Sequence, residues 1–212
     1  MAKGKSALAM ALKKKIGSND EIQKVSHWID SGFPPLNKAI SGRYDGGFPS
    51  GRIVEIFGPP SAGKTFLATA AMVSAQKQEG LAVFLDHENS FDVGLAVANG
   101  LNADEDDGQW VYKQPDTFEE SVELIGTILK LVRDEELIPA DAPICIVADS
   151  LASMVPNSKA EKFDKMAEGT AKDKDQLNMN DNTALARATS ANFPTLALWA
   201  RKYNACIIFL NQ

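Results

Sequence analysis

The sequence has few cysteines, no long apolar run and no excess of positive charge, and each of these absences narrows the choice of function. Its two cysteines, Cys145 and Cys206, both lie inside apolar, strand-like runs. That placement favours small buried side chains in a reducing compartment over a disulfide or a metal site. No run approaches the roughly 18 apolar residues of a membrane-spanning helix.

The N-terminal residues and the net charge bear on two further classes, secreted proteins and proteins that bind nucleic acid through their overall charge. The N-terminus is basic, but no apolar segment and cleavage site follow it, so it does not resemble a secretory signal. The net charge of −6 gives no overall attraction to nucleic acid, although a local patch can still bind it. These features predict a cytoplasmic protein without a membrane attachment. A chain of 212 residues is long enough for one α/β domain with a substantial core.

Short apolar runs rich in β-branched residues alternate with segments of helical periodicity. The predicted strands are residues 52–57, 81–86, 110–112, 143–149 and 205–211. The predicted helices are residues 66–78, 91–99, 118–135 and 183–203, and Pro194 is expected to kink or divide the last of them. This alternation predicts an α/β fold with a mainly parallel central sheet and helices on both faces.

Three further segments differ in composition from these strands and helices. Residues 5–15 form a short basic amphipathic helix, which needs either a partner subunit or its own domain to pack on. Residues 31–51 are rich in Gly, Pro and Ser and read as a loop. Residues 157–182 carry many charges and few large apolar groups, which predicts a mobile surface loop at about 157–182. A loop of this length is often functional, and the alternative is a solvated linker.

The most informative motif is a complete phosphate-binding loop that stands between a predicted strand and a predicted helix. Its glycines let the backbone approach phosphates, and its N–H groups form a positive concavity at the helix N-terminus. Lys64 is expected to reach the β- and γ-phosphate oxygens of ATP, and Thr65 to ligate Mg²⁺. The cofactor-binding residues of this loop are Gly58, Pro59, Pro60, Ser61, Ala62, Gly63, Lys64 and Thr65.

Polar residues follow other predicted strands, where the carboxyl ends of a parallel sheet converge. Asp149 ends the apolar run 144–148, which is the Walker B pattern for a second Mg²⁺ ligand. Glu88 follows the 81–86 strand and is the candidate general base, with a solvated helix-cap acid as the alternative. His87 has no partner pattern for metal or triad chemistry and is interpreted as structural. Gln212 follows the last strand and can hydrogen-bond a γ-phosphate.

Taken together, these motifs resemble the RecA recombinase family, including its phage-encoded UvsX-like relatives. The resemblance is carried by the run from Gly46 to Pro59, which is similar to the family's GGLPxGRIVEIYGP segment. It is also carried by 84–88 followed by Asp92, by 114–116, by the Asp149-Ser150 pair and by 209–212. It covers most of residues 5–212.

The resemblance implies a RecA-type P-loop ATPase core over residues 31–212, preceded by an oligomerisation segment over residues 1–30. It implies catalytic roles for Glu88 as general base and for Lys64, an adenine contact for Asp92, and a γ-phosphate sensor in Gln212. The implied partners are single-stranded DNA and further copies of the chain in a helical filament, joined through the N-terminal helix. The segment 157–182 corresponds in position to the family's first DNA-binding loop.

The sequence departs from the family in two respects. The family's first DNA-binding loop is shorter, and the segment here has nearly balanced charge and no arginine. The family also continues beyond the position of Gln212, so the chain is expected to be the N-terminal portion of a recombinase, with a missing C-terminal half or a full-length recombinase as a possible partner. The alternatives are another RecA-fold motor, such as a helicase or repair paralogue, a truncated nucleotide-binding subunit, and, more remotely, a small-molecule kinase.

Overall fold

The computed structural model describes residues 24–104, 106, 108–171, 181 and 183–212, together with Met10 and residues 13–15. Met10 and residues 13–15 are helical, and the rest of the helix predicted for residues 5–15 lies outside the described residues. Within the described part of the chain, no helix combines the length and the apolar character needed to cross a membrane.

The centre of the molecule is a parallel sheet of five strands in the order β3-β7-β6-β4-β5. Every residue of β6, the middle strand, and of its neighbour β4 is buried, which explains why they read as continuous apolar runs rather than alternating ones. The predicted strands and their parallel arrangement are confirmed. The strands are β3 (Arg52–Phe57), β4 (Leu81–Asp86), β5 (Trp110–Lys113), β6 (Ile144–Asp149) and β7 (Ala205–Asn211).

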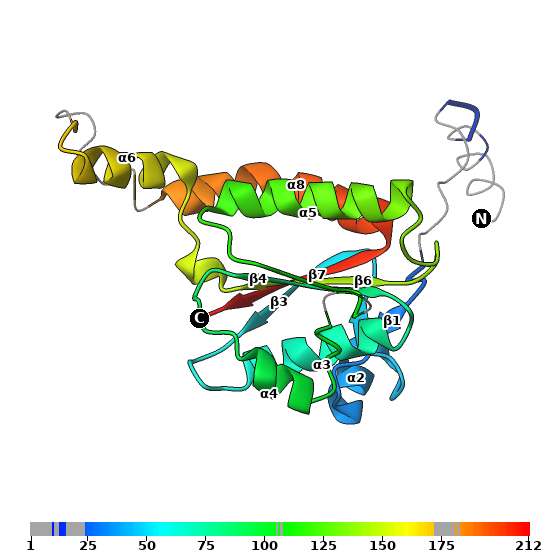
Figure 1. Ribbon diagram of the computed structural model, residues 1–212. Coiled ribbons are helices and arrows are strands. Elements are labelled where there is room, and N and C mark those ends of the chain that lie inside the picture. Colours follow the sequence, from blue (N-terminus) through cyan, green and yellow to red (C-terminus); the bar gives the residue numbers. More distant parts are fainter. Residues whose placement is uncertain are drawn as a thin grey trace.

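Helices cover both faces of the sheet, as predicted (Figure 1). One face packs against α5 (Phe118–Asp134) and α8 (Ala184–Tyr203), and the other against α3 (Lys64–Gln76) and α4 (Val93–Ala98). The two faces hold separate apolar clusters. The inner face of α3, which packs on the sheet, is made largely of alanine, including the fully buried Ala68, Ala71 and Ala75.

The prediction of a loop over residues 31–51 is wrong in part. The segment contains α2 (Pro34–Ser41) and strand β2 (Phe48–Pro49), which pairs antiparallel with β1 (Trp28–Ile29). Pro34 is tolerated because it opens the helix, and Gly42 ends it in the left-handed conformation at φ 76°. Gly47 is needed for close packing, since a Cβ there would lie 2.1 Å from the Ile29 carbonyl oxygen.

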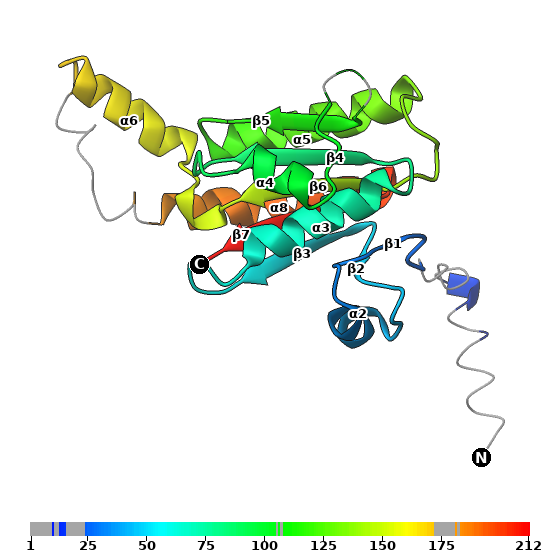
Figure 2. The same cartoon turned by 60° about the horizontal axis from the view of Figure 1, so that its bottom comes forward.

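The prediction of a loop at about 157–182 is wrong for its first part, where α6 (Asn157–Ala167) forms. Its residues are mostly good helix formers and none is Gly or Pro, so the segment can be helical without a buried face. The helix projects away from the body of the protein (Figures 1 and 2). Lys162 on α6 pairs with Asp181 at 3.0 Å. Residues 172–180 and 182 lie outside the described residues.

Pro194 does not divide the predicted helix, because α8 continues through it from Ala184 to Tyr203. A proline removes one backbone hydrogen bond, but packing can hold a helix together across the gap. Leu196 and Ala200 are fully buried on one face of this helix, and Phe193 stacks on Phe209 of β7 at 5.1 Å between ring centroids. Tertiary packing therefore overrides the local effect of the proline.

Candidate ATP and magnesium site

The phosphate-binding loop joins the carboxyl end of β3 to the first turn of α3, as the motif predicts. Gly63 precedes the helix with φ 86°, a conformation that favours glycine. The Lys64 Nζ donates to the carbonyl oxygens of Gly58 at 2.8 Å and Pro59 at 2.9 Å. The ammonium group thus lies folded over the mouth of its own loop, where phosphate oxygens can replace the two carbonyls.

Thr65 and Asp149 meet at the amino end of α3. The Thr65 Oγ1 donates to the Asp149 Oδ2 at 3.1 Å, although the two residues belong to different strand–helix units. Burial raises the pKa of Asp149 to about 6, with smaller contributions from the charges of Glu88 and Asp86, while the Thr65 hydrogen bond and Lys64 act in the opposite direction. Bringing a cation next to Asp149 would favour its charged form.

These two residues fit a Mg²⁺ ion. Magnesium in nucleotide sites is held by one or two protein ligands together with phosphate oxygens and water, rather than by a cage of side chains. Among the described residues, no group of three or more His, Cys, Asp or Glu side chains is placed to hold a metal ion. A hydroxyl and a carboxylate that already lie within hydrogen-bond distance provide the protein's share of such a site.

Glu88 lies beside this pair, in the turn that follows β4. Its Oε1 accepts hydrogen bonds from the Ser150 hydroxyl and from the Gln212 Nε2, the latter at 3.2 Å. Ser150 follows Asp149 through a cis peptide bond, and Gln212 follows β7. The structure therefore brings together Glu88, Asp149 and Gln212 from the ends of three strands, as convergence at the carboxyl edge predicts.

The end of β7 is also tied to the start of the phosphate-binding loop. The Asn211 side-chain amide donates to the Glu55 Oε1 at 2.8 Å, and the Gly58 N–H donates to the Asn211 carbonyl oxygen at 3.3 Å. Gln212 therefore directly follows a residue, Asn211, that contacts the phosphate-binding loop, although β7 is far from that loop in the sequence.

Comparison with known proteins identifies the family. Residues 4–212 match the RecA N-terminal domain. The chain belongs to the RecA family. The resemblance seen in its motifs and the predicted RecA-type fold are both confirmed by this match and by curated relatives.

Three of these relatives are proteins named Protein RecA. The chain is 37% identical to that of Treponema denticola over 198 residues, which are 93% of this chain and 41% of the relative. It is 40% identical to that of Desulforapulum autotrophicum over 147 residues, or 69% of this chain and 37% of the relative. It is 36% identical to that of Borrelia hermsii over 184 residues, or 87% and 44%. The chain therefore spans less than half the length of these RecA proteins.

The sequence reasoning missed one residue that shapes this RecA-type site. Asp86 is almost fully buried at the end of β4, and its carboxylate accepts hydrogen bonds from the backbone N–H groups of Glu88 and Phe91, both at 3.1 Å. It also accepts from the Tyr112 hydroxyl at 2.9 Å. Burial, then the Asp86 hydrogen bond and charge, raise the pKa of Tyr112 to about 12, so Tyr112 remains a donor. The only signal in the sequence was an acid at the end of a buried run.

His87 has the structural place expected for it. Its Nε2 lies 2.7 Å from the Ser121 Oγ on α5, and its backbone N–H donates to the Asp149 carbonyl oxygen at 2.7 Å. Burial lowers the pKa of His87, and the nearby charges of Asp86 and Glu120 only partly oppose this. The neutral ring therefore fastens the Glu88 turn to α5.

Asp92 caps α4, since its Oδ1 accepts from the Leu95 N–H at 2.8 Å. This contact explains the residue type at the start of the helix without reference to a nucleotide. An adenine contact for Asp92 remains a prediction.

Proposed function

We propose that this chain binds Mg²⁺–ATP at the site described above and supplies the ATPase core of a RecA-type recombinase that acts on single-stranded DNA. The observation that carries the proposal is the convergence of Thr65, Asp149, Glu88 and Gln212 at one edge of the sheet, although they come from four separate segments. This set contains two ligands for Mg²⁺, a candidate base and an amide donor, and all of them lie beside a phosphate-binding loop. ATP hydrolysis requires such groups.

Each residue has a distinct part in this mechanism. The backbone of residues 58–65 and the Lys64 ammonium would hold the phosphates, and Thr65 and Asp149 would hold Mg²⁺. A bound Mg²⁺ would supply positive charge next to the phosphate oxygens. Glu88 orients and activates the attacking water. Its carboxylate already accepts two hydrogen bonds, so it is held in place before any nucleotide arrives.

Gln212 is the proposed sensor of the γ-phosphate. In the present arrangement its amide contacts Glu88, and a γ-phosphate oxygen offers the same amide an alternative acceptor. Exchange of one acceptor for the other would move the end of β7. We expect this movement to couple ATP to DNA binding.

DNA binding is assigned to the 157–182 segment, whose first part is α6. This helix projects from the end of the molecule at which the strands terminate, and it begins seven residues after Ser150 (Figure 1). The proposed assembly is a helical filament on DNA, in which the N-terminal segment docks on a neighbouring subunit. The proposed location is the cytoplasm. A longer recombinase, or the part of the RecA relatives that this chain does not span, is a further proposed partner.

The test measures ATP turnover with and without single-stranded DNA, and ATP affinity separately. In Lys64→Ala we expect ATP binding to be lost. In Glu88→Gln we expect binding to remain and turnover to fall by roughly 100-fold or more. The matched controls are Lys130→Ala and Glu123→Gln, both on the exposed side of α5, which should change neither quantity.

The outcomes separate the candidate functions. Turnover that rises with DNA and falls in both site variants supports a DNA-dependent ATPase. ATP binding that depends on Lys64 but gives no turnover indicates a nucleotide-binding subunit that needs another chain. Ring-shaped rather than helical assemblies in electron micrographs would instead favour a helicase-like motor. Absence of ATP binding would overturn the proposal.

A further inference from the structure

His87 joins three parts of the candidate ATP site. It directly precedes Glu88, its backbone N–H donates to the Asp149 carbonyl oxygen at 2.7 Å, and its ring reaches α5. Glu88 and Asp149 belong to different strands, because Asp149 ends β6 and Glu88 follows β4. The separation between the candidate base and the candidate Mg²⁺ ligand therefore depends on where His87 lies.

The Ser121 hydroxyl ties this turn to a helix. Its Oγ lies 2.7 Å from the His87 Nε2, and either neutral form of the ring can make the bond because a hydroxyl both donates and accepts. The Asp86 carboxylate and the Asp149 carbonyl hold the same turn to β4 and β6, which both lie in the sheet. Contacts in two layers, the sheet and the helix α5, fix both the position and the tilt of the turn.

Ser121 is a firm anchor because it lies in the first turn of a well-held helix. Thr117 caps α5, and its Oγ1 accepts from the Glu120 N–H at 3.2 Å. Phe118 is fully buried, and its ring centroid lies 6.4 Å from that of Phe193 on α8. Ser121 itself is only 1% exposed, so water has little access to its hydroxyl. A hydrogen bond in such surroundings is stronger than one in water.

The His87–Ser121 pair is not placed to contact the phosphates. The His87 ring points to α5, whereas the phosphate-binding loop leads into α3 on the opposite face of the sheet. The pair can therefore act on the proposed hydrolysis only through the residues that it holds, Glu88 and Asp149.

We propose that His87 and Ser121 form a positioning pair that holds Glu88 at a fixed separation from Asp149 during ATP hydrolysis. The inference rests on the proposed function and extends it from the groups that would touch the nucleotide to a pair that would not. It gives the candidate base two kinds of support, since side chains from other strands hold its carboxylate and this pair holds its backbone.

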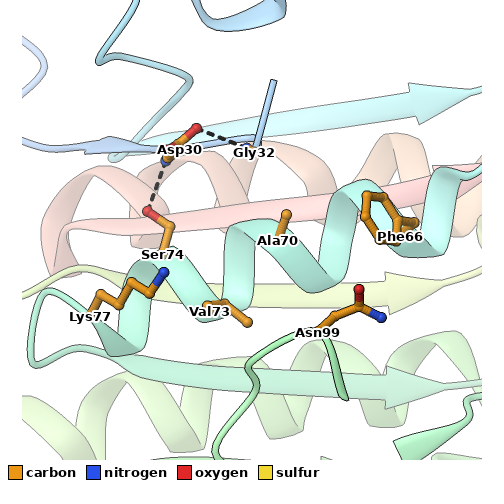
Figure 3. A pocket seen from close by; sticks show the side chains of 8 residues that line it. All are labelled: Asp30, Gly32, Phe66, Ala70, Val73, Ser74, Lys77 and Asn99. Atoms are coloured by element: carbon orange, nitrogen blue, oxygen red, sulfur yellow. Dashed lines mark hydrogen bonds between the residues drawn. The ribbon is translucent and has the colours of Figure 1, made fainter. Parts of the chain in front are cut away.

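Steady-state kinetics with ATP test this role. Ser121→Ala should lower kcat about ten-fold and leave KM unchanged, because a shifted base slows chemistry without weakening binding. The matched control is Ser74→Ala, which also removes a helix hydroxyl that holds a neighbouring segment, and it should change neither constant. Ser74 lines a cavity of about 260 Å³ on the outer face of α3, where its Oγ accepts from the Asp30 N–H at 2.9 Å (Figure 3).

Two replacements of His87 separate the hydrogen bond from the loss of the ring. The amide nitrogen of Gln is separated from Cα by as many bonds as the imidazole Nε2, so the side chain in His87→Gln can still reach Ser121. Asn is shorter and cannot. We expect His87→Gln to retain most of kcat and His87→Asn to lose about ten-fold. Equal kcat values for the two variants would overturn the role of this bond.

Hydrogen exchange gives a readout that does not need turnover. In Ser121→Ala, the backbone N–H groups of His87 and Glu88 should exchange about ten-fold faster, because the turn has lost a tether. The N–H of Val83, which is fully buried within β4, should exchange as before. Equal acceleration at Val83 would show a general loss of stability, and unchanged exchange at the turn would show that it does not depend on Ser121. Either result overturns the proposal.

The kinetic outcomes distinguish this inference from the proposed function. Turnover that depends on Glu88 but is unchanged in Ser121→Ala overturns only the positioning role, as does a raised KM without a loss of kcat. An equal loss of kcat in Ser74→Ala overturns it too, because kcat would then follow stability. If the unaltered chain does not turn over ATP, the proposed hydrolysis fails and the positioning role fails with it.

Discussion

Glu88 receives hydrogen bonds from two side chains that come from different strands. Ser150 is fully buried and donates its hydroxyl to the Glu88 Oε1, and the same hydroxyl lies 3.2 Å from the Ser153 Oγ. Ser150 itself is not placed to touch a substrate. In the proposed hydrolysis it can act only by holding the Glu88 carboxylate in one orientation, which is a positioning role.

We predict that Ser150→Ala lowers kcat for ATP about ten-fold and leaves KM unchanged, because a misplaced base slows chemistry without weakening binding. Steady-state kinetics of the folded variant check this split. The control is a double-mutant cycle, in which Ser150→Ala should have no further effect in a Glu88→Gln background. An equal loss in both backgrounds would show that Ser150 acts on something other than Glu88.

Tyr112 supports the turn that carries Glu88, because its hydroxyl donates to the buried Asp86 carboxylate, which in turn accepts from the backbone of that turn. We predict that Tyr112→Phe lowers the free energy of unfolding by about 1.5–3 kcal/mol, since the change removes a hydrogen bond to a charged group. Urea denaturation measures the difference. Tyr44→Phe is the matched control, because the Tyr44 ring is mostly exposed. A Tyr112→Phe variant as stable as the unaltered chain would show that Asp86 does not need this donor.

Among the elements, β6 and β7 carry the two cysteines at directly paired positions. Cys145 and Cys206 are in register on these neighbouring parallel strands, and both are fully buried. Burial raises the pKa of both thiols, that of Cys206 to about 12. Thiolate is the reactive form, so neither cysteine should react while the sheet is intact.

We predict that an aromatic disulfide reagent at pH 8 labels neither cysteine of the native chain on the timescale of minutes and labels both at once in denaturant. The raised pKa values of the two thiols also affect the free energy of unfolding. Because the folded chain holds these protons more tightly than the unfolded chain, stability is unaffected below about pH 9 and falls as the pH rises from there towards 12. Fast labelling of the native chain at pH 8 would contradict the buried pairing.

The elements that the sequence predicted well are those whose residue pattern is dictated by burial. Strands such as Leu81–Asp86 are covered on both faces and therefore read as unbroken apolar runs. The helix α6 was missed because it is largely exposed, so its helical propensity was not accompanied by an apolar stripe. The sequence does not predict α2, because Pro34 and Gly42, which lie at its two ends, are residue types that are common in loops.

The same contrast holds for the site. The positions of Thr65, Asp149, Glu88 and Gln212 follow from one rule, that parallel strands end at a common edge. The contacts of Asp86, Tyr112 and Ser150 depend on the path of individual turns, for which the sequence carries no periodic signal. Convergence of the chain was therefore predictable, and the hydrogen bonds that orient Glu88 were not.

At the scale of these 212 residues as a whole, the sheet is protected unevenly. The strands β4 and β6 are buried along their whole length, whereas β3 lies at one edge and pairs with β7 alone among the described strands. Its side chains are half-buried or exposed, and the ring of Phe57 at its end is 76% exposed. An edge strand with unpaired backbone groups and exposed apolar side chains is a template for pairing with another chain.

We therefore predict that this chain associates through β3 even without nucleotide or DNA, which distinguishes the contact from a filament that requires them. Phe57→Lys should lower the average mass measured by light scattering, because a charge at an edge opposes strand pairing. Leu131→Lys, on the exposed side of α5, is the matched control and should leave the mass unchanged. If both variants associate as strongly as the unaltered chain, the contact lies elsewhere than on β3. If the unaltered chain is monomeric at all concentrations, the prediction is wrong.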